Sequence, residues 1–356
     1  MKKISLSPIK AIIQDAKRGK IFILVDNKNR ENEGDLVIPA SKTNSKSINF
    51  MAKHGRGLVC LALTKKQVDK LSLPLMSAVN KARMQTAFTV SIEAKKGITT
   101  GISTFDRAKT IKVAIDKNSK KKDIVSPGHV FPLVARNGGV LERAGHTEAS
   151  VDISKLAKLN PSSVICEVMN EDGRMARLDD LLKFASRHNL KIASIEDLIS
   201  YRLKNEKFVF NILNRKMKIK KIGSLNLSIF KNKLNNTEHY ALSRGKLNTK
   251  KSIRVRVISI NMSKKIEKIK DILFLQSIKY LSKHNNFALI IIKNEILKIK
   301  KKDVVKSTNT LRYYGIGAQI IKDLKIKNMI LVSRSRKKVI GLDGYGIKIT
   351  KQEIIQ

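Results

Sequence analysis

Two short apolar runs near the start of the chain are separated by a strongly polar turn. The first run is Ile21–Val25 and the second is Leu36–Ile38, and both are rich in branched aliphatic residues. Runs of this length, bounded by polar residues or proline, are typical of buried strands. Between them lies Arg30–Asp35, with the sequence RENEGD. We therefore expect two strands whose neighbouring ends are joined by an acidic turn.

Patterns of helix and strand alternate along the rest of the first 200 residues. Ser7 and Pro8 are typical of a helix start, as N-cap and first position, and Gly19 is typical of a helix end. The other elements we expect are a helix at 46–54 capped by Gly55, strands at 57–63, 88–92 and 164–168, a helix opened by Ser103 or Thr104, and helices at 178–188 and 194–199. This alternation predicts an α/β (α+β) fold.

The length of 356 residues indicates more than one hydrophobic core. Beyond about residue 205 the composition shifts toward Lys, Ile and Asn, and 203–207 is a candidate boundary. We therefore expect two domains, 1–204 and 205–356. The first should have a mixed sheet with flanking helices, and the second should be a further α/β domain.

The acidic turn is the most informative stretch for chemistry. The carboxylates of Glu31, Glu33 and Asp35 repel one another, and such an arrangement usually persists where a cation or a polar substrate binds. On residue pattern alone, a site for a divalent metal or a sugar phosphate and an ordinary solvated acidic turn remain equal alternatives.

Other polar residues stand where packing would not require them. His129 lies on a turn bracketed by prolines, and His146 lies beside Arg143 and Thr147 at an expected helix start. A helix N-terminus with Arg and Thr suits a phosphate, and histidine is the commonest nitrogen ligand for metals. Glu167 lies within an apolar run, where a carboxylate needs a partner. Together these residues favour a functional site over isolated structural roles.

The loop at 97–104 is rich in Gly, Thr and Ser. Its hydroxyl and backbone N–H groups could bind a phosphate, especially ahead of the helix that contains Asp106 and Arg107. Simple turn chemistry explains the same composition. Both interpretations are kept at this point.

The formal charge of +44 suggests a polyanionic partner such as RNA. Aromatic residues make up only 5% of the chain and Trp is absent, whereas single-strand binders stack bases on aromatic rings. A compositional drift toward Lys is the plainer explanation, so nucleic acid is an unlikely partner. A basic RNA-binding or scaffold protein on an old enzyme fold remains the alternative.

Cys60 and Cys166 are the two cysteines, and each lies far from the other inside an apolar run. We expect neither a disulfide framework nor a cysteine-ligated zinc site. No apolar run approaches the ~20 residues of a membrane span, and the N-terminal residues do not resemble a signal peptide. We expect a cytoplasmic protein that does not bind membranes.

Six motifs together resemble one enzyme family, 3,4-dihydroxy-2-butanone 4-phosphate synthase of riboflavin biosynthesis. They lie in order and with family-like spacing across residues 5–202. The motifs are RENEGDL at 30–36, TTGIS at 99–103, DRA at 106–108, SPGH at 126–129, RAGHTEA at 143–149 and CEV at 166–168.

The resemblance implies a specific reaction. The family converts D-ribulose 5-phosphate into L-3,4-dihydroxy-2-butanone 4-phosphate and formate, a lyase reaction that uses Mg²⁺ or Mn²⁺, two ions per active site, usually in a homodimer. Carried over, Glu31 and His146 would be the metal ligands, and His129 and Glu167 would act in catalysis. The first base is assigned hypothetically to Asp35 or Glu33. The residues expected to contact substrate are Arg30, Glu31, Asp35, Arg143, Ala144, Gly145, His146, Thr147 and Glu167.

Three stretches of the second half resemble GTP cyclohydrolase II: 237–242, 253–257, and 314–320 through 344–347. That family binds catalytic zinc through three cysteines, but no cysteine follows Cys166 and the corresponding residues 258–264 read ISINMSK. Its glycine-containing nucleotide loop is replaced by 292–298, IKNEILK. We expect no zinc and no cyclohydrolase activity. Dimerisation, coupling to other riboflavin enzymes, RNA binding and a tolerated remnant all remain open as roles for this half.

Overall fold

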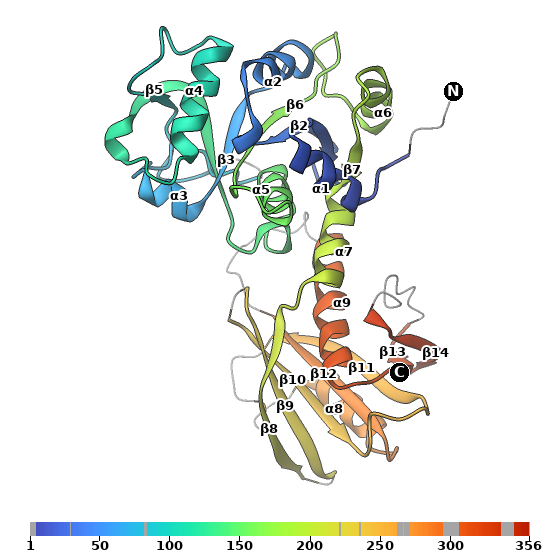
Figure 1. The fold of residues 1–356 in the computed structure, drawn as a ribbon. Coiled ribbons are helices and arrows are strands. Elements are labelled where there is room, and N and C mark those ends of the chain that lie inside the picture. Colours follow the sequence, from blue (N-terminus) through green and yellow to red (C-terminus); the bar gives the residue numbers. More distant parts are fainter. Residues whose placement is uncertain are drawn as a thin grey trace. The chain divides into compact units, whose positions relative to one another are not determined.

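The computed structural model describes residues 5–28, 30–81, 84–220, 222–234, 236–261, 266, 271–294, 306–335 and 345–355, with the side chains of 294 and 306–314 left out. Contacts between residues divide the chain into two units, Met1–Ile199 and Ser200–Gln356. Each unit is built around its own seven-stranded sheet (Figure 1).

The sheet of the first unit is mixed, with strand order β4-β5-β3-β6-β2-β1-β7. Antiparallel pairs join β1 to β2 and β2 to β6, while β1 pairs in parallel with β7 and β3 pairs in parallel with β5. The strands are β1 Phe22–Val25, β2 Gly34–Pro39, β3 Cys60–Thr64, β4 Ile92–Ala94, β5 Ile124–Ala135, β6 Ser163–Glu167 and β7 Ile192–Ser194. The predicted mixed-sheet α/β domain is confirmed.

Helices cover both faces of this sheet. Buried residues of α2, α4 and α6 pack in one apolar cluster with alternate strand residues such as Ile23 and Val25. On the opposite face, α5 packs against β2, β3, β5 and β6 and also contacts α1. The helices are α1 Ile9–Arg18, α2 Ser45–Phe50, α3 Lys65–Lys70, α4 Thr104–Ile115, α5 His146–Leu156 and α6 Leu178–Arg187. A further helix, α7 Ile195–Asn205, contains the boundary between the two units. The start of α5 lies next to the start of β2 and the end of β6.

Two predicted helix caps differ from the structure, and the helix predicted at 194–199 is Ile195–Asn205. The N-cap of α1 is Pro8 rather than Ser7, whereas Gly19 ends the helix in a left-handed conformation as expected. The helix predicted at 46–54 is α2 followed by a π-helical turn, Met51–Gly55, and the cap is Arg56 at φ 68°. Gly55 instead permits close packing, because a Cβ there would lie 2.9 Å from the Cys166 sulfur.

The segment around His129 is not the turn that its prolines suggested. It lies within β5, whose pairing with β4 shifts from Val130 opposite Ile92 to Val125 opposite Glu93. Residues 126–129 therefore form an irregularity inside a strand. The strand predicted at 88–92 is also wrong in extent, since before β4 it makes only isolated bridges.

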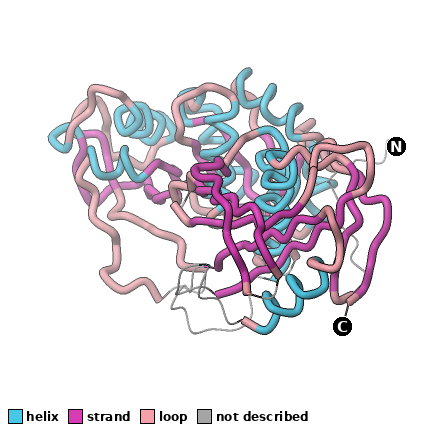
Figure 2. The backbone as a smooth tube through the Cα atoms, turned by 90° about the horizontal axis from the view of Figure 1, so that it is seen from below, coloured by secondary structure: helices cyan, strands magenta, loops and turns pink. Residues whose placement is uncertain are grey.

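The second unit has a sheet of order β14-β13-β11-β12-β10-β9-β8, which confirms the expected α/β class. Its strands are β8 Val209–Ile219, β9 Gly223–Asn232, β10 Glu238–Arg244, β11 Ile253–Asn261, β12 Phe287–Asn294, β13 Asn328–Ser333 and β14 Lys348–Ile354, and its helices are α8 Ile272–Leu281 and α9 Lys306–Asp323. Figure 2 shows the helices and strands of the chain separated by colour. The stretches 262–264, 295–298 and 344, used in the comparison with cyclohydrolase, lie outside the described residues.

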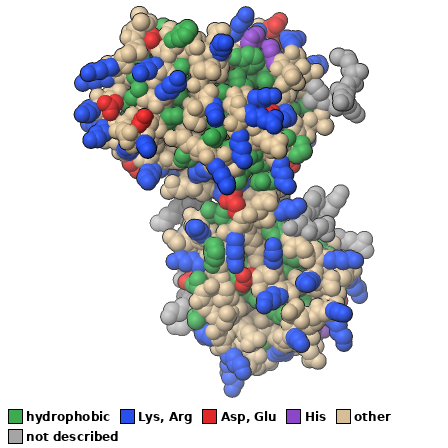
Figure 3. Space-filling model, viewed as in Figure 1, with side chains coloured by type: hydrophobic (Ala, Val, Ile, Leu, Met, Phe, Trp, Pro, Cys, Tyr) green, Lys and Arg blue, Asp and Glu red, His purple; other side chains and the backbone are tan. Residues whose placement is uncertain are grey.

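Basic side chains are not gathered into one patch on the face of the molecule drawn in Figure 3. On the face drawn in Figure 3, Lys and Arg are scattered over both units. In the described part of the chain, no helix combines the length and the apolar character needed to cross a membrane.

Candidate active site

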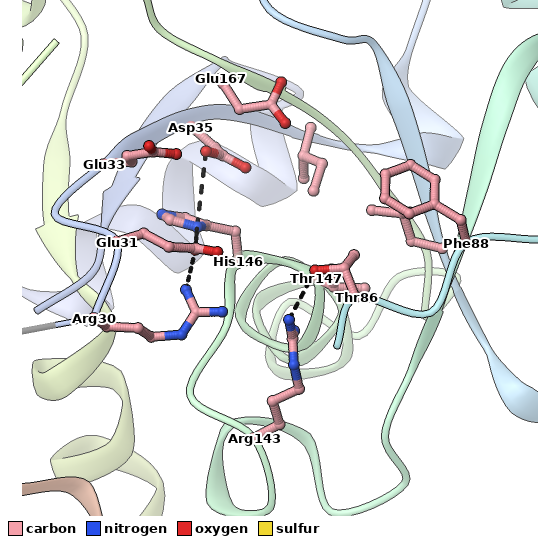
Figure 4. Close-up of a pocket in the computed structure, with 12 residues that line it drawn as sticks. Arg30, Glu31, Glu33, Asp35, Thr86, Phe88, Arg143, His146, Thr147 and Glu167 are labelled. Atoms are coloured by element: carbon pink, nitrogen blue, oxygen red, sulfur yellow. Dashed lines mark hydrogen bonds and ion pairs between the residues drawn. The ribbon is translucent and has the colours of Figure 1, made fainter. Parts of the chain in front are cut away.

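A cavity in the first unit lies where the acidic turn, β6 and the start of α5 come together. Its volume, including the solvent at its open mouth, is about 470 Å³. Figure 4 shows side chains of the turn pointing toward His146, with Arg143 on the opposite side. The lining residues are Arg30, Glu31, Glu33, Asp35, Thr86, Phe88, Leu133, Arg143, His146, Thr147, Ile165 and Glu167.

Asp26 holds the acidic turn together from within. Its carboxylate accepts hydrogen bonds from the backbone N–H groups of Glu31 (3.1 Å) and Glu33 (2.9 Å) and from the Arg30 guanidinium (2.8 Å). The Asp26 side chain is only 1% exposed. Sequence reasoning missed this residue, although an aspartate at the end of a strand commonly bonds the backbone of the turn that follows.

Glu31 and His146, 115 positions apart in sequence, meet in the cavity. The Nδ1 atom of His146 lies 3.8 Å from Glu31 Oε2 and 3.8 Å from Asp35 Oδ1. These are ion-pair distances, too long for hydrogen bonds. His146 Nε2 and Asp35 Oδ1 are buried and have no hydrogen-bond partner. Buried polar atoms without partners are rare and indicate that something else can bind them.

The charges of this cluster shift the pKa values of its members. Burial, reinforced by the carboxylates of Glu167, Glu31 and Glu33 and opposed by His146, raises the pKa of Asp35 to about 7. Burial alone would raise the pKa of Glu31, but contact with His146 and the positive charge of Arg30 lower it to about 2.

The same group of charges raises the pKa of His146. Burial would lower the pKa of His146, but the carboxylates of Asp35, Glu31 and Asp26 raise it to about 9. At neutral pH the Glu31 carboxylate is therefore ionised, and the Asp35 carboxyl is poised between its two protonation states.

Strand pairing brings Glu167 to the same cavity. Asp35 and Glu167 are direct partners in the β2–β6 ladder, so their side chains share one face of the sheet. The Glu167 carboxylate accepts a hydrogen bond from the Leu58 N–H at 2.8 Å. Gly57 makes this approach possible, because a Cβ there would lie 2.6 Å from both the backbone oxygen and the Oε2 atom of Glu167.

Arg143 forms the other wall. Its guanidinium donates to Glu148 Oε2 at 2.7 Å, and to the Met84 carbonyl and Thr86 Oγ1 at 3.0 Å each. Thr86 and Phe88 line the cavity but were not predicted, because nothing in their local sequence distinguishes them from ordinary strand residues. The bonds to Arg143 fix their segment beside the start of α5.

Some predicted site residues are not in the cavity. Ala144 and Gly145 precede α5, with Gly145 as its N-cap, but neither lines the cavity. His129 is also outside the lining and pairs with Glu93. Since β3 and β6 separate its strand from β2, His129 and Asp35 stand on backbones about 14 Å apart at ~4.8 Å per strand.

The Gly/Thr loop uses its polar groups internally. Asp106 accepts hydrogen bonds from the Thr99 N–H (3.1 Å), the Thr99 hydroxyl (2.7 Å) and the Gly101 N–H (3.1 Å). Ser103 caps α4 by accepting from the Asp106 N–H. Turn chemistry therefore accounts for these contacts of the loop, and a phosphate site there stays a prediction.

The donor set at the acidic turn fits a hard divalent cation. Asp26, Glu31 and His146 each offer one ligand atom, all within 4.8 Å of one another. Both oxygens of Asp26 already accept hydrogen bonds, which suits an anchor of the turn. Glu31 Oε2 also accepts a hydrogen bond from the Arg30 guanidinium, so the Glu31 carboxylate and the His146 imidazole could hold a cation beside that arginine.

Each half of the chain contains residues that match a protein family model. Residues 10–201 match the family model of 3,4-dihydroxy-2-butanone 4-phosphate synthase, and residues 276–353 match that of GTP cyclohydrolase II. The riboflavin biosynthesis protein RibBA of Aquifex aeolicus is 41% identical, over 98% of this chain and 92% of its own length.

Solved structures agree with these matches. A two-domain 3,4-dihydroxy-2-butanone 4-phosphate synthase, RibBX from A. baumannii, superimposes with a TM-score of 0.83 at 38% identity, covering 98% of this chain and 99% of its own. A 3,4-dihydroxy-2-butanone 4-phosphate synthase in complex with two magnesium ions gives a TM-score of 0.54 at 38% identity, covering 56% of this chain and 98% of its own.

Proposed function

Because the chain belongs to the 3,4-dihydroxy-2-butanone 4-phosphate synthase family, we propose that it converts D-ribulose 5-phosphate into L-3,4-dihydroxy-2-butanone 4-phosphate and formate. The chain is an enzyme of riboflavin biosynthesis. The observation that carries the proposed reaction is the meeting of Glu31 and His146 beside the buried Asp35 carboxyl.

Glu31 and His146 are the proposed protein ligands for Mg²⁺ or Mn²⁺, with two ions per site. The orphaned His146 Nε2 atom and the magnesium-bound relative support this assignment. Bound there, divalent cations would polarise the substrate ketone and stabilise negative charge on its oxygens. Few protein ligands are needed, since Mg²⁺ retains water or accepts substrate oxygens.

The remaining lining residues have proposed roles in binding and proton transfer. Arg30, Arg143 and Thr147 offer donors to the phosphate and hydroxyl groups of the substrate. Asp35, with a pKa of about 7, suits removal of the proton next to the ketone, and Glu167 suits later proton transfers. Leu58, through its bond to Glu167, holds that carboxylate toward the cavity.

The reaction is tested by product formation. With ribulose 5-phosphate and Mg²⁺, the purified chain should release formate and the four-carbon phosphate in equal amounts, and removal of the metal with a chelator should stop both. A chain ending near residue 204 should retain the activity, because a solved synthase relative corresponds to this part alone. Lack of formate release from the intact chain with Mg²⁺ or Mn²⁺ would contradict the proposal.

The second half is proposed to lack GTP cyclohydrolase II activity, although it matches that family over residues 276–353. No cysteine follows Cys166, so the three thiolate ligands of a catalytic zinc are missing. The same formate assay should give no product from GTP, even with added zinc. Release of formate from GTP above the level of a heat-denatured sample would overturn this proposal.

We also propose a homodimer in which His129 serves the cavity of the other subunit. Within one chain, β3 and β6 separate the strand of His129 from β2, His129 is not among the residues that line the cavity, and its side chain is 44% exposed. A catalytic role therefore requires a second chain to bring it there.

Mixing two inactive variants tests this arrangement. Glu31→Gln and His129→Asn chains, exchanged into mixed dimers, should recover about a quarter of the wild-type activity, since half of the dimers would hold one intact site. If His129 acts within its own chain, the mixture will show no more activity than the two variants measured separately.

The alternative of a basic binding protein rests on charge alone. Binding to an RNA column at physiological salt by the intact chain, but not by the chain ending near residue 204, would favour it. A cytoplasmic location remains part of the proposal, since the phosphorylated substrate is a small metabolite.

A further inference from the structure

Helix α6 begins next to the acidic turn and contacts it from outside the cavity. The Nη1 atom of Arg177, the residue that precedes the helix, donates hydrogen bonds to the backbone carbonyls of Glu31 (2.8 Å) and Asn32 (2.5 Å). It also lies 4.0 Å from Glu33 Oε1. Arg177 thus bonds the backbone of the proposed ligand Glu31 without lining the cavity.

One residue of this contact, Asn32, has a left-handed backbone conformation. The backbone of Asn32 has φ 56°, in the left-handed region that disfavours most side chains. Three carboxylates of the turn also repel one another. Asp26 binds the N–H groups of the turn, and Arg177 binds its carbonyl groups. Asp26 and Arg177 therefore hydrogen-bond to different groups of the same short backbone segment.

The position of Arg177 is itself fixed by α6. Its N–H donates to Asp180 Oδ2 at 3.0 Å, and Asn170 donates to the same atom at 3.2 Å. The buried Leu181 packs against the turn at Gly34, where a Cβ would lie 2.5 Å from Leu181 Cδ1. Packing at Gly34 and hydrogen bonding through Arg177 therefore join the helix to the turn at two points.

We propose that Arg177 is a positioning residue that sets the direction of the Glu31 carboxylate by holding the backbone of the acidic turn. The inference rests on the proposed function, in which Glu31 binds the cation. Loss of Arg177 would leave the Glu31 side chain intact but free to sample directions that do not face His146. The cation would then bind more weakly, because the free-energy cost of ordering the turn would be subtracted from the free energy of binding.

The test compares Arg177→Gln with Arg174→Gln in the full chain. Arg174 lies three positions earlier, is 85% exposed and pairs with Asp172, so its replacement removes the same charge without touching the turn. Mn²⁺ affinity of the enzyme without substrate, measured by titration calorimetry or electron paramagnetic resonance, should fall about tenfold for Arg177→Gln. It should stay at the wild-type value for Arg174→Gln.

A third variant separates geometry from charge. Arg177→Lys keeps the positive charge but not the planar guanidinium, so it should recover part of the lost affinity. KM for ribulose 5-phosphate at saturating Mn²⁺ should change less than the Mn²⁺ dissociation constant. The proposal is wrong if Arg177→Gln lowers the melting temperature but binds Mn²⁺ as tightly as the wild type, which is the result expected of a purely structural contact.

Failure of the proposed function would look different. If the wild-type chain neither binds Mn²⁺ at Glu31 nor forms the four-carbon phosphate, the metal site itself is wrong. If the wild type binds and turns over while Arg177→Gln behaves like Arg174→Gln, the site stands and only the role of Arg177 is overturned.

Discussion

Replacing Glu31 by glutamine should lower kcat/KM for ribulose 5-phosphate about a thousandfold, equivalent to about 4 kcal/mol of transition-state stabilisation. The amide has nearly the same shape as the carboxylate but carries no charge and is a poor ligand for a hard cation. Glu31 lies 3.8 Å from His146 and has a pKa lowered to about 2, so the wild-type group is ionised across the working pH range. Initial rates of formate release at saturating Mg²⁺ measure the loss.

A matched control is available on the surface. Glu171 is 82% exposed and lies 3.7 Å from Arg56, so Glu171→Gln removes one carboxylate of the same type away from the cavity. Its activity should stay within twofold of the wild type, as is usual for exposed substitutions.

A double variant tests whether Glu31 and His146 act as one unit. Glu31→Gln combined with His146→Gln should be little worse than either single change, because ligands of one site are not additive. A Glu31→Gln enzyme with more than a tenth of the wild-type kcat/KM would contradict the metal assignment.

Local signals predicted the elements that build the site. The apolar runs on either side of RENEGD are β1 and β2, and Gly145 and His146 do begin a helix. These predictions succeeded because strand burial and helix ends depend on residues within a few positions. The pattern alone left a metal site and a solvated acidic turn as alternatives, and the family resemblance was needed to choose Glu31 and His146.

Long-range geometry could not be predicted from the sequence. The β2–β6 register, which sets Asp35 opposite Glu167, depends on pairing between segments more than 120 positions apart. The same holds for Arg177, whose bonds to the turn join positions 146 and 145 residues apart. The local sequence does not determine such pairings, because they depend on strand order and helix packing.

For His129, the sequence motif was recognised, but its position in the fold was predicted wrongly. SPGH was read as a turn near the other site residues, yet it lies in β5, and β3 and β6 lie between this strand and β2. Prolines usually interrupt strands, and here they lie in a strand whose pairing with β4 is irregular. Its catalytic role stays a prediction that depends on a second subunit.

Replacing Asp35 by asparagine should lower kcat between a hundredfold and ten thousandfold and should abolish exchange of the substrate C3 proton with solvent. Burial and neighbouring carboxylates raise the pKa of Asp35 to about 7, which matches a general base to neutral pH. The amide keeps the shape of the side chain but cannot accept the proton. Incubation of ribulose 5-phosphate with the variant in D₂O, followed by NMR of the C3 position, measures the exchange directly.

Glu33→Gln provides the comparison, because Glu33 is the other candidate base and its pKa is also raised by burial and by Glu31. Its side chain is 25% exposed, whereas that of Asp35 is 4% exposed and lies 3.8 Å from His146. Water can replace a proton acceptor at the more open position far better than at the buried one, so Glu33→Gln should retain C3 exchange. If exchange persists unchanged in Asp35→Asn and is lost in Glu33→Gln, the first base is Glu33, and the buried carboxyl of Asp35 acts in substrate binding instead.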